Sequence, residues 1–509
     1  MLDALRGARR SREHRRAMQE LDRRERQLRP GYKVWGYKNV FAKGFLVTRG
    51  EAAPPRDTWE RATIGPWRAI VDPELERSAA TSADAAVLVL GHAFDEGGAR
   101  TRDRVASRIL RAAEASGGVD AQTRAMDAVV TWLSGRYVVL VARGERLDAY
   151  ADPLAARSIY WHAGASGPAL ASHTELLSSL AGGLSSERMR WIADNRDYRA
   201  PAGRWLPGLI TPHDEVGQVY ANGRLTVQGD AVSHERFFPS DDRVELSLAD
   251  AGERFRDELR AQVQNWISIA PLTVLSLTAG RDSRAVLEAG LVELQRARAM
   301  TMTYHPFHVA SKSTYQDFHA AARLSAAAGL PHLGIDVAAM QPTSQMAGLY
   351  RSTFPTWQRY ANLANALYLH SPARAATIFG VGGAIITGMW KDTSDRHLTP
   401  QLLASKYTSS AFADDPALHA ELERWMAFTD FSIDALRGYD FYDFYHWEHR
   451  MTKWAGSGYS EYDLATIPAP VLSSRRLLVA ALSLPKQQRV DAEVYRYIST
   501  DGELGTAPR

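Results

Sequence analysis

Residues 273–290, TVLSLTAGRDSRAVLEAG, join an apolar run to a helix-like pattern through a short turn of small and polar residues. A buried strand, a small-residue turn and a helix start form the general design for holding a phosphate group. Small residues let the backbone approach the ligand, and the free N–H groups of the first helical turn point toward the anion. The segment therefore predicts an anion site at the end of a buried strand.

The sequence around this segment predicts a parallel sheet. Residues 247–268 have helical spacing, and strand-like and helix-like runs then alternate along the chain. The expected strands are 272–277, 299–305, 332–337 and the run ATIFGVGG at 376–383, and the expected helices are 282–298 and 314–329. Such alternation is typical of βαβ units, whose ligands lie beyond the carboxyl ends of the strands. His305 or His308, in HPFH, would line that crevice, unless the stretch is only a turn at Pro306.

The first half of the chain has a different pattern. Short β-rich runs such as NVFAKGFLVT, AAVLVLGHAF and RYVVLVARG alternate with loops, and only 102–133 has helical spacing. Asn222-Gly223 predicts a hairpin turn. We therefore expect an α+β domain with antiparallel sheets over 31–239 and an α/β domain over 240–509.

Positive charge is concentrated at the start of the chain. Residues 1–30 hold ten Arg against five acids, a balance of +5, whereas the whole chain carries +3, so the remainder carries −2. A basic arm of this kind attracts nucleic acid or an anionic membrane surface. We favour the alternative, a solvated helix with i,i+4 ion pairs or a disordered tail, and expect no nucleic-acid partner.

The chain has no cysteine, no run of about 18 apolar residues and no apolar signal core near its start. We therefore expect no disulfide, no thiolate metal site, no cysteine nucleophile and no transmembrane segment. These features favour a cytoplasmic protein.

Four stretches resemble one protein family. LSLTAGRDSRAVL resembles the pyrophosphate loop S-G-G-x-D-S of the ATP-pyrophosphatase superfamily. ADPLAARSIYW and LASHTELL resemble the D-P-x-G-x-x-x-L-Y-Y and F-A-S-E-x-K-A-L elements of the amidotransferase domain in asparagine synthetase-type proteins. EHRMTKWAGSGYSEYDLATIPAPVLSSRRLLVAALSLP resembles the D-R-x-x-M-A … P-F-L-D … L-P region of their synthetase domain, so the resemblance covers about 85 to 500.

The resemblance implies both a fold and a reaction. The fold is an Ntn-type αββα sandwich, a degenerate class II glutamine amidotransferase-like domain, over 31–239. An ATP-pyrophosphatase-type parallel α/β synthetase domain follows over 240–509, behind the basic arm 1–30. Family members use ATP and Mg²⁺ to adenylate a carboxylate, which an amine then attacks to give an amide.

The resemblance also implies site residues. Asp282 matches the loop aspartate that holds magnesium-pyrophosphate, and Arg281 and Arg284 are additional cations near the loop. Asp317 lies where relatives often carry an aspartate, although a favourable charge at a helix N-terminus also explains it. The expected ATP-binding residues are Ser276, Thr278, Ala279, Gly280, Arg281, Asp282, Ser283, Gly380 and Gly382.

Several positions depart from the family pattern. Glutamine-dependent members use an N-terminal cysteine, but this chain has Leu2 and no cysteine, so we expect no glutaminase activity. Val381 and Ala384 stand where relatives carry an acid or tyrosine and a magnesium-binding aspartate. Lys486 is the one lysine that remains near the late loop where relatives place a catalytic lysine.

These departures leave two functional hypotheses. The first is an amide-forming ligase that takes ammonia or an amine, as in β-lactam synthetase-type relatives. It would act in natural-product, peptide-cyclising or cell-surface polymer biosynthesis, on a small-molecule or peptide carboxylate, as a homodimer or with a biosynthetic partner. Glu448 would replace the missing base, and Arg450 matches the family's D-R arginine, although both also fit an aromatic-rich packing helix. The second hypothesis is a catalytically degenerate relative that binds a nucleotide or a partner.

Overall fold

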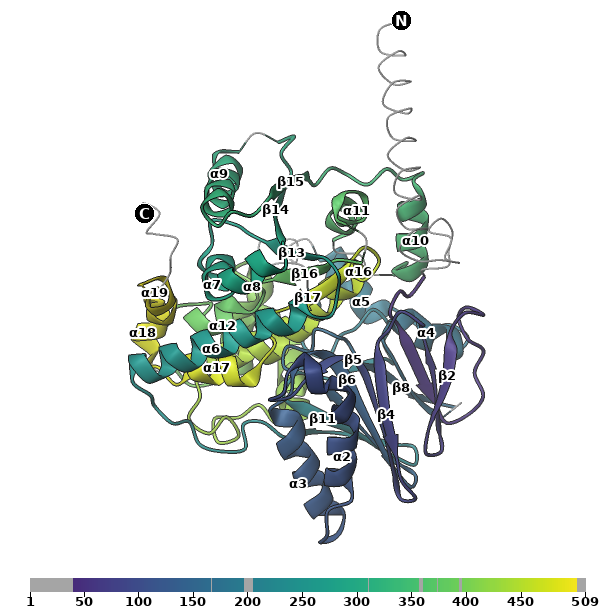
Figure 1. Cartoon of the computed structure of the whole chain (residues 1–509). Helices are drawn as coiled ribbons and strands as arrows, with labels where there is room; N and C mark the ends of the chain where they lie inside the picture. Colours follow the sequence, from purple (N-terminus) through teal and green to yellow (C-terminus); the bar gives the residue numbers. More distant parts are fainter. Residues whose placement is uncertain are drawn as a thin grey trace, which may run out of the picture.

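The computed structural model describes residues 40–165, 167–195, 205–309, 311–356, 360–372, 374–392 and 396–500. The predicted basic arm 1–30 lies outside the described residues. In Figure 1 the first part of the chain, purple to blue, lies beside the part that continues from teal to yellow. No helix among the described residues is long and apolar enough to cross a membrane.

Two antiparallel sheets form the first part of the chain, as the sequence predicts. One has the strand order β10-β8-β9-β1-β3-β2 and the other β12-β11-β7-β6-β5-β4. The strands are β1 (Phe45–Thr48), β2 (Glu60–Ile64), β3 (Trp67–Val71), β4 (Arg77–Thr81), β5 (Ala85–Phe94), β6 (Ser134–Arg143), β7 (Arg146–Ala151), β8 (Tyr160–Gly164), β9 (Gly167–Ala171), β10 (Gly217–Gln218), β11 (Gly223–Gln228) and β12 (Ala231–Arg236).

Helices cover the outer faces of both sheets. The pair α2 (Val105–Ala113) and α3 (Gly118–Thr131) lies over the second sheet, where α2 buries Val105, Ile109 and Ala112 at helical spacing. On the other side, α4 (Thr174–Leu180) packs on β8 and β9, and α5 (Glu187–Asp194) follows it. Because β2 contacts β5 and β6, the layers stack in the order α, β, β, α.

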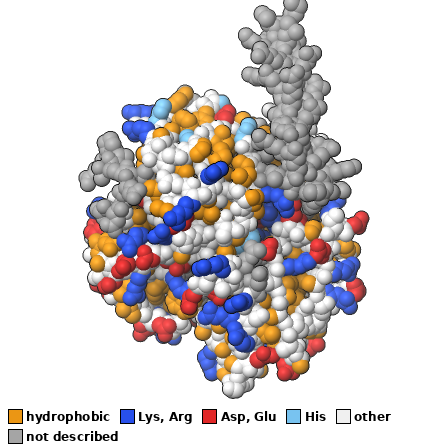
Figure 2. Space-filling view, viewed as in Figure 1, with side chains coloured by type: hydrophobic (Ala, Val, Ile, Leu, Met, Phe, Trp, Pro, Cys, Tyr) orange, Lys and Arg blue, Asp and Glu red, His pale blue; other side chains and the backbone are white. Residues whose placement is uncertain are grey.

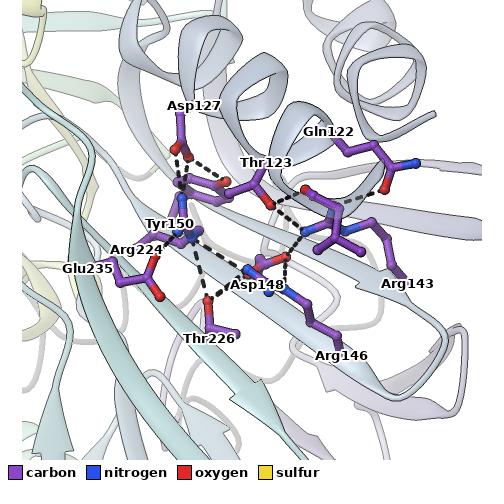
Figure 3. Close-up of polar contacts among 11 residues, drawn as sticks. Gln122, Thr123, Asp127, Arg143, Arg146, Asp148, Tyr150, Arg224, Thr226 and Glu235 are labelled. Carbon is purple, nitrogen blue, oxygen red and sulfur yellow. Dashed lines mark hydrogen bonds and ion pairs between the residues drawn. The ribbon is translucent and has the colours of Figure 1, made fainter. Parts of the chain in front are cut away.

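A buried polar cluster fastens α3 to its sheet (Figure 3). Asp148 is fully buried and accepts hydrogen bonds from Arg143 (2.6 Å), Arg146 (2.9 Å) and Thr226 (2.7 Å). Burial alone would raise the pKa of Asp148, but the hydrogen bonds from the two arginines outweigh it and hold the pKa below its usual range. Arg224 of β11 binds Asp127 of α3 at 2.7 Å, so the layer contact is ionic as well as apolar.

A hairpin turn was predicted at Asn222-Gly223, and that prediction is wrong. Gln228 pairs with Ala231, so Gly229 and Asp230 form the turn between β11 and β12. Asn222 does adopt the left-handed conformation that the prediction requires, with φ of 68°. Its backbone precedes β11, and its side chain is used in contacts with the second part of the chain, as described below.

The second part of the chain contains a parallel sheet of five strands in the order β15-β14-β13-β16-β17. Its strands are β13 (Thr273–Ser276), β14 (Met300–His305), β15 (His332–Asp336), β16 (Ala376–Phe379) and β17 (Ile467–Pro470). The four strands expected from the sequence are therefore confirmed. The expected helix 282–298 is two helices, which meet at Gly290.

Helices precede, connect and follow these strands. They are α6 (Leu248–Ile267), α7 (Arg281–Ala289), α8 (Leu291–Arg296), α9 (Lys312–Ala327), α10 (Gln345–Thr353), α11 (Ala361–His370), α12 (Gly383–Thr387), α13 (Pro400–Tyr407), α14 (Pro416–Thr429), α15 (Phe441–Phe444), α16 (Gly456–Tyr462), α17 (Arg475–Leu482), α18 (Lys486–Val490) and α19 (Glu493–Thr500). Short 3-10 turns lie at Ala99–Arg104 and Ala411–Asp414, and Tyr445–Ala455 is π-helical. Figure 2 shows acidic and basic side chains interspersed over the visible face, which fits the near-neutral charge of the chain after the arm.

Buried polar side chains lie between the two parts of the chain. Asp463 accepts two hydrogen bonds from Arg136, both 2.7 Å, and the Lys43 ammonium group donates to the Asp463 carbonyl at 2.7 Å. The Lys453 ammonium group donates to the Ile210 carbonyl at 2.8 Å. The two parts are therefore joined by buried charges, and each charge depends on a partner in the other part.

Lys453 makes the stability of this junction depend on pH. Burial lowers its pKa from 10.5 to about 7, and Glu421 offsets only part of this effect. Between these values the unfolded chain binds more protons than the folded chain, so stability rises with pH. We expect Lys453 to contribute up to about 1.4 kcal/mol per pH unit to the free energy of unfolding between pH 7.5 and 9.5. Urea unfolding across this range should show a flatter profile for Lys453→Met, and an unchanged slope would contradict the assignment.

Candidate functional site

The strand order reverses in the middle of the parallel sheet. β13 and β16 are neighbours, whereas the chain runs outward from β13 through β14 to β15 before it returns to β16 and β17. Ligands of such sheets bind in the crevice at the carboxyl ends of the two strands where the order reverses. The loop after β13 leads into α7 and the loop after β16 leads into α12, so both predicted loops lie at this position.

The loop after β13 is a compact turn that its own side chains hold. Thr278 donates its backbone N–H to the Ser283 hydroxyl at 3.1 Å, and the Thr278 hydroxyl accepts the Gly280 N–H at 3.0 Å. Ala279 and Gly280 are exposed. The structure therefore brings together four residues predicted for phosphate binding and presents the backbone at the tip of the turn.

Asp317 binds the tip of this loop from α9. One carboxylate oxygen accepts the Ala279 N–H, and the other lies 2.6 Å from Nε2 of His305, at the end of β14. Asp317 is in the second turn of α9, so it is not a charge in the first helical turn. His308 is engaged elsewhere, with Asp336 at 2.9 Å. The carboxylate of Asp317 therefore already accepts the Ala279 N–H, which is the group that a phosphate oxygen would approach.

Removing Asp317 should loosen the loop. In Asp317→Ala the Ala279 amide loses its acceptor, and we expect its hydrogen exchange to accelerate by about tenfold or more, since a hydrogen bond to a charged group contributes roughly 1.5–3 kcal/mol. Asp336→Ala is the matched control, because that carboxylate binds His308 and not the loop. Equal exchange of the Ala279 amide in both variants would show that Asp317 does not hold the turn.

The second loop packs directly on the first. A Cβ atom on Gly380 would lie 3.3 Å from the Ser283 nitrogen, and one on Gly383 would lie 2.0 Å from Cγ of Asp282. Gly382 has φ of +113°, which favours glycine. The two predicted glycines, Gly380 and Gly382, are thus part of the same site as Asp282. Gly383, not singled out from the sequence, makes the closest approach.

Asp282 lies in this close contact and is largely shielded from solvent. Burial raises the pKa of Asp282, and the neighbouring Tyr495 hydroxyl and Arg281 charge offset only part of the rise. Within the described residues no group of three or more His, Asp or Glu side chains is placed to hold a metal ion. Mg²⁺ often keeps only one or two protein carboxylates and takes its other ligands from phosphates and water. Asp282 therefore fits a magnesium ion that arrives with a nucleotide, and does not build a metal site alone.

The remaining predicted residues differ in their surroundings. Ser276, at the end of β13, forms a side-chain hydrogen bond with Tyr304 of β14. Arg281 is exposed at the start of α7, where a phosphate can reach it. Arg284 instead pairs with Glu288 at 2.7 Å, one turn along the same helix. Of the two cations near the loop, Arg281 is thus the better placed for an anionic ligand.

Glu448 lies in a buried ion pair between the two parts of the chain. Both of its oxygens bind the guanidinium of Arg236, at 2.5 and 2.7 Å, and Asn222 donates to it at 3.0 Å. Arg475, fully buried, donates to the other end of the Asn222 amide at 2.9 Å. These contacts give Glu448 a structural partner on each oxygen.

Arg450 and Lys486 also have neighbours of their own. The guanidinium of Arg450 lies over the Trp205 ring at 4.8 Å and the Trp454 ring at 5.6 Å. Lys486 pairs with Asp440 at 3.0 Å and Asp443 at 3.2 Å. These neighbours of both cations lie outside the loop after β13.

Comparisons with known proteins find only low similarity for this chain. No protein-family model matches the sequence, and no curated protein matches it. A solved structure described as the allosteric regulatory enzyme of purine biosynthesis matches with a TM-score of 0.24 and 10% identity, over 48% of this chain and 57% of that one. Glutamine phosphoribosylpyrophosphate amidotransferase from B. subtilis, complexed with ADP and GMP, matches with a TM-score of 0.22 and 10% identity, over 70% and 74%. The chain thus spans little more than half of the first of these, and similarity this low defines neither fold nor activity.

Proposed function

We propose that the protein is an ATP- and Mg²⁺-dependent ligase that forms an amide from a carboxylate and an amine, and that it is an asparagine synthetase-like member of the ATP-pyrophosphatase superfamily. One observation carries the proposal. The turn at Thr278, Ala279 and Gly280, exposed at its last two residues, and the start of α7 lie where the strand order of the parallel sheet reverses, next to the glycine loop after β16. This is the position and chemistry expected for a pyrophosphate site.

The proposed reaction has two steps. A carboxylate oxygen attacks the α-phosphorus of ATP, the bond to the β-phosphate breaks, and pyrophosphate leaves. The amine nitrogen then attacks the acyl carbon, the C–O bond to the phosphate breaks, and AMP leaves while the nitrogen loses a proton. Charge builds first on the leaving pyrophosphate, and the first backbone N–H groups of α7 with the charge of Arg281 are suited to stabilise it. A bound Mg²⁺, held by the nucleotide and Asp282, would neutralise more of that charge.

The amine in this proposal does not come from glutamine. The chain contains no cysteine, so the thiolate that releases ammonia in glutamine-dependent enzymes is absent. Ammonia, a small amine or an amine within the acyl substrate supplies the nitrogen. A biosynthetic role in natural products, cyclised peptides or cell-surface polymers fits this chemistry.

Exchange of labelled pyrophosphate into ATP tests the proposal. Exchange requires a reversible adenylation, so it should appear with Mg²⁺ and only with particular members of a panel of carboxylic acids. If calorimetry shows ATP binding but no acid supports exchange, the ligase assignment fails.

One observation favours a second function, that of a nucleotide- or partner-binding subunit. Val381 packs against the apolar core, and Ala384 offers no ligand, so the loop after β16 supplies no acid beside Asp282. Burial also favours the neutral form of Asp282. ATP binding without AMP formation is the result that this second function predicts.

A further inference from the structure

A groove with a volume of about 950 Å³ lies between the two parts of the chain. The first part contributes Glu96, shortly after β5, and Trp132, directly after α3. The second part contributes side chains of α6 and α17, and the segment 238–246, which leads from β12 to α6, supplies six more. None of the described residues that line the groove belongs to the loops after β13 and β16. The groove is therefore separate from the candidate nucleotide site.

Two large apolar side chains in the groove are open to solvent. Trp132 is 38% exposed and Val244 is 66% exposed. The other large apolar side chains in the lining are Phe238, Leu246, Tyr439 and Val479. The aliphatic stem and planar head of an arginine pack well on aromatic and apolar surfaces while the charge stays near water. The groove therefore offers contact area to arginine side chains as well as to apolar ones.

The groove also concentrates negative charge. Its acidic lining residues are Glu96, Asp241, Asp242, Asp257 and Glu258. Against them stand Arg254 and Arg476, which leaves a balance of −3, whereas residues 31–509 together carry −2. Glu96, Asp242 and Asp257 each have an arginine neighbour, yet their side chains are 71%, 86% and 64% exposed. Because ion pairs on the surface are weak, these carboxylates stay open to a further cation.

Arg476 shows how the groove holds a guanidinium group. Its guanidinium carbon lies 5.7 Å from the centre of the Trp132 ring, and Nη2 lies 2.9 Å from a carboxylate oxygen of Glu96. Nη1 donates to the Trp132 carbonyl at 3.0 Å. Arginine makes such contacts better than lysine, because its planar head stacks on a ring and still donates hydrogen bonds at its edge. The chemistry of the groove therefore favours a segment rich in arginine.

The arm 1–30, which lies outside the described residues, has the complementary composition. It holds ten Arg and no Lys, carries +5, and includes Leu5, Leu21 and Leu28. Residues 31–39 join it to Val40, where the described residues begin, and nine extended residues reach about 30 Å. A segment tethered to its own chain has an effective concentration on the order of 1 mM. The chain's own arm is therefore favoured over the arm of a second copy at ordinary protein concentrations.

We propose that this groove binds the arm 1–30 of the same chain, with arginine side chains of the arm against Trp132 and the open carboxylates. The inference stands on the groove and on the sequence of the arm, and it does not rest on the proposed ligase function. Because the carboxylates are exposed, salt screens their attraction for the arm. The arm should therefore leave the groove as the ionic strength rises.

Photo-cross-linking of the full chain tests the proposal. Since the chain has no cysteine, Ala17→Cys or Gln27→Cys gives the arm a single attachment point for a benzophenone cross-linker. At an ionic strength of about 20 mM we expect cross-links within one chain to Trp132 or to the segment 238–246, located by mass spectrometry. Raising the ionic strength to about 0.5 M should reduce their yield several-fold, because the screening length becomes shorter than an ordinary side-chain separation.

A groove variant and a matched control separate charge in the groove from charge elsewhere. The groove variant combines Asp241→Asn, Asp242→Asn and Asp257→Asn, and it should reduce the yield by about tenfold, since three surface ion pairs are lost together. The control removes the same charge from three acids outside the groove, through Asp84→Asn, Glu114→Gln and Glu423→Gln. All six positions are exposed, so both variants should keep the fold.

A mixture of heavy-isotope-labelled and unlabelled chains separates cross-links within one chain from those between chains by their mass. Cross-links between chains would show that a second copy supplies the arm, and would overturn the proposal. Equal yields in the groove variant and the control would also overturn it. So would the absence of cross-links to the groove from both arm positions.

Discussion

Asp463→Ala is expected to lower the free energy of unfolding by about 3–5 kcal/mol, because removing one partner leaves buried cations without compensation. Asp463 is 4% exposed and binds Arg136 through two hydrogen bonds of 2.7 Å. The guanidinium of Arg157, also buried, lies 3.8 Å from the same carboxylate. Urea unfolding measures the loss, and Asp434→Ala, at an exposed position, is the control that should change stability little.

The carboxylate of Asp463 should also make the free energy of unfolding depend on pH in the acidic range. Burial alone would raise the pKa of Asp463, but Arg136 and Arg157 outweigh it and hold the pKa below its usual range. Because the folded pKa is lower than the unfolded value, the contribution is present above about pH 4. It is lost as the pH falls through the folded pKa. Wild type and Asp463→Ala should therefore converge in stability on acidification. A constant difference between them from pH 6 to pH 2 would contradict the buried ion pair.

Gly383→Ala is expected to reduce acid-dependent pyrophosphate exchange by about 100-fold or more, comparable to the loss of one stabilising group in a transition state. A Cβ atom at this position would lie 2.0 Å from Cγ and 2.2 Å from both oxygens of Asp282, so the carboxyl group must move. Side-chain rotation relieves the overlap, so the fold should persist. Gly50→Ala is the matched control, since no heavy atom lies within 4 Å of a Cβ there.

A double-variant cycle shows whether this effect passes through Asp282. If Gly383 acts by leaving space for that carboxyl group, Asp282→Ala should reduce exchange by a similar factor. Gly383→Ala in the Asp282→Ala background should then add little. If the two substitutions instead reduce exchange by independent factors that multiply, Gly383 does not act through the Asp282 carboxyl group.

The arrangement of the parallel sheet could be predicted because its signals are local. Each strand of the alternating pattern is a short apolar run that a small-residue turn or a helix follows, so β13, β14, β15 and β16 were found close to their observed bounds. The residues Thr278, Gly280 and Ser283 meet because they belong to one turn. Residues that are neighbours in the sequence can be predicted to lie together without knowledge of the tertiary fold.

The contacts that the sequence did not reveal join distant segments. Asn222 has the left-handed backbone of a hairpin residue, but its side chain bridges Glu448 and Arg475 across the two parts of the chain. Glu448 was predicted as a base from its place in a resembling motif, whereas Arg236, more than two hundred residues earlier, holds both of its oxygens. Asp317 and Gly383 contact the loop after β13 from two other elements. Spacing along the chain carries no signal for such pairs.

Transfer of a heavy oxygen isotope from substrate to AMP tests the central claim most directly. A carboxylic acid that supports exchange is labelled in both carboxylate oxygens and incubated with ATP, Mg²⁺ and an amine, and AMP is analysed by mass spectrometry. If a carboxylate oxygen attacks the α-phosphorus and the acyl C–O bond later breaks, each AMP carries one labelled oxygen. Unlabelled AMP, or ADP in place of AMP, would contradict the acyl-adenylate and with it the proposed function of the site between β13 and β16.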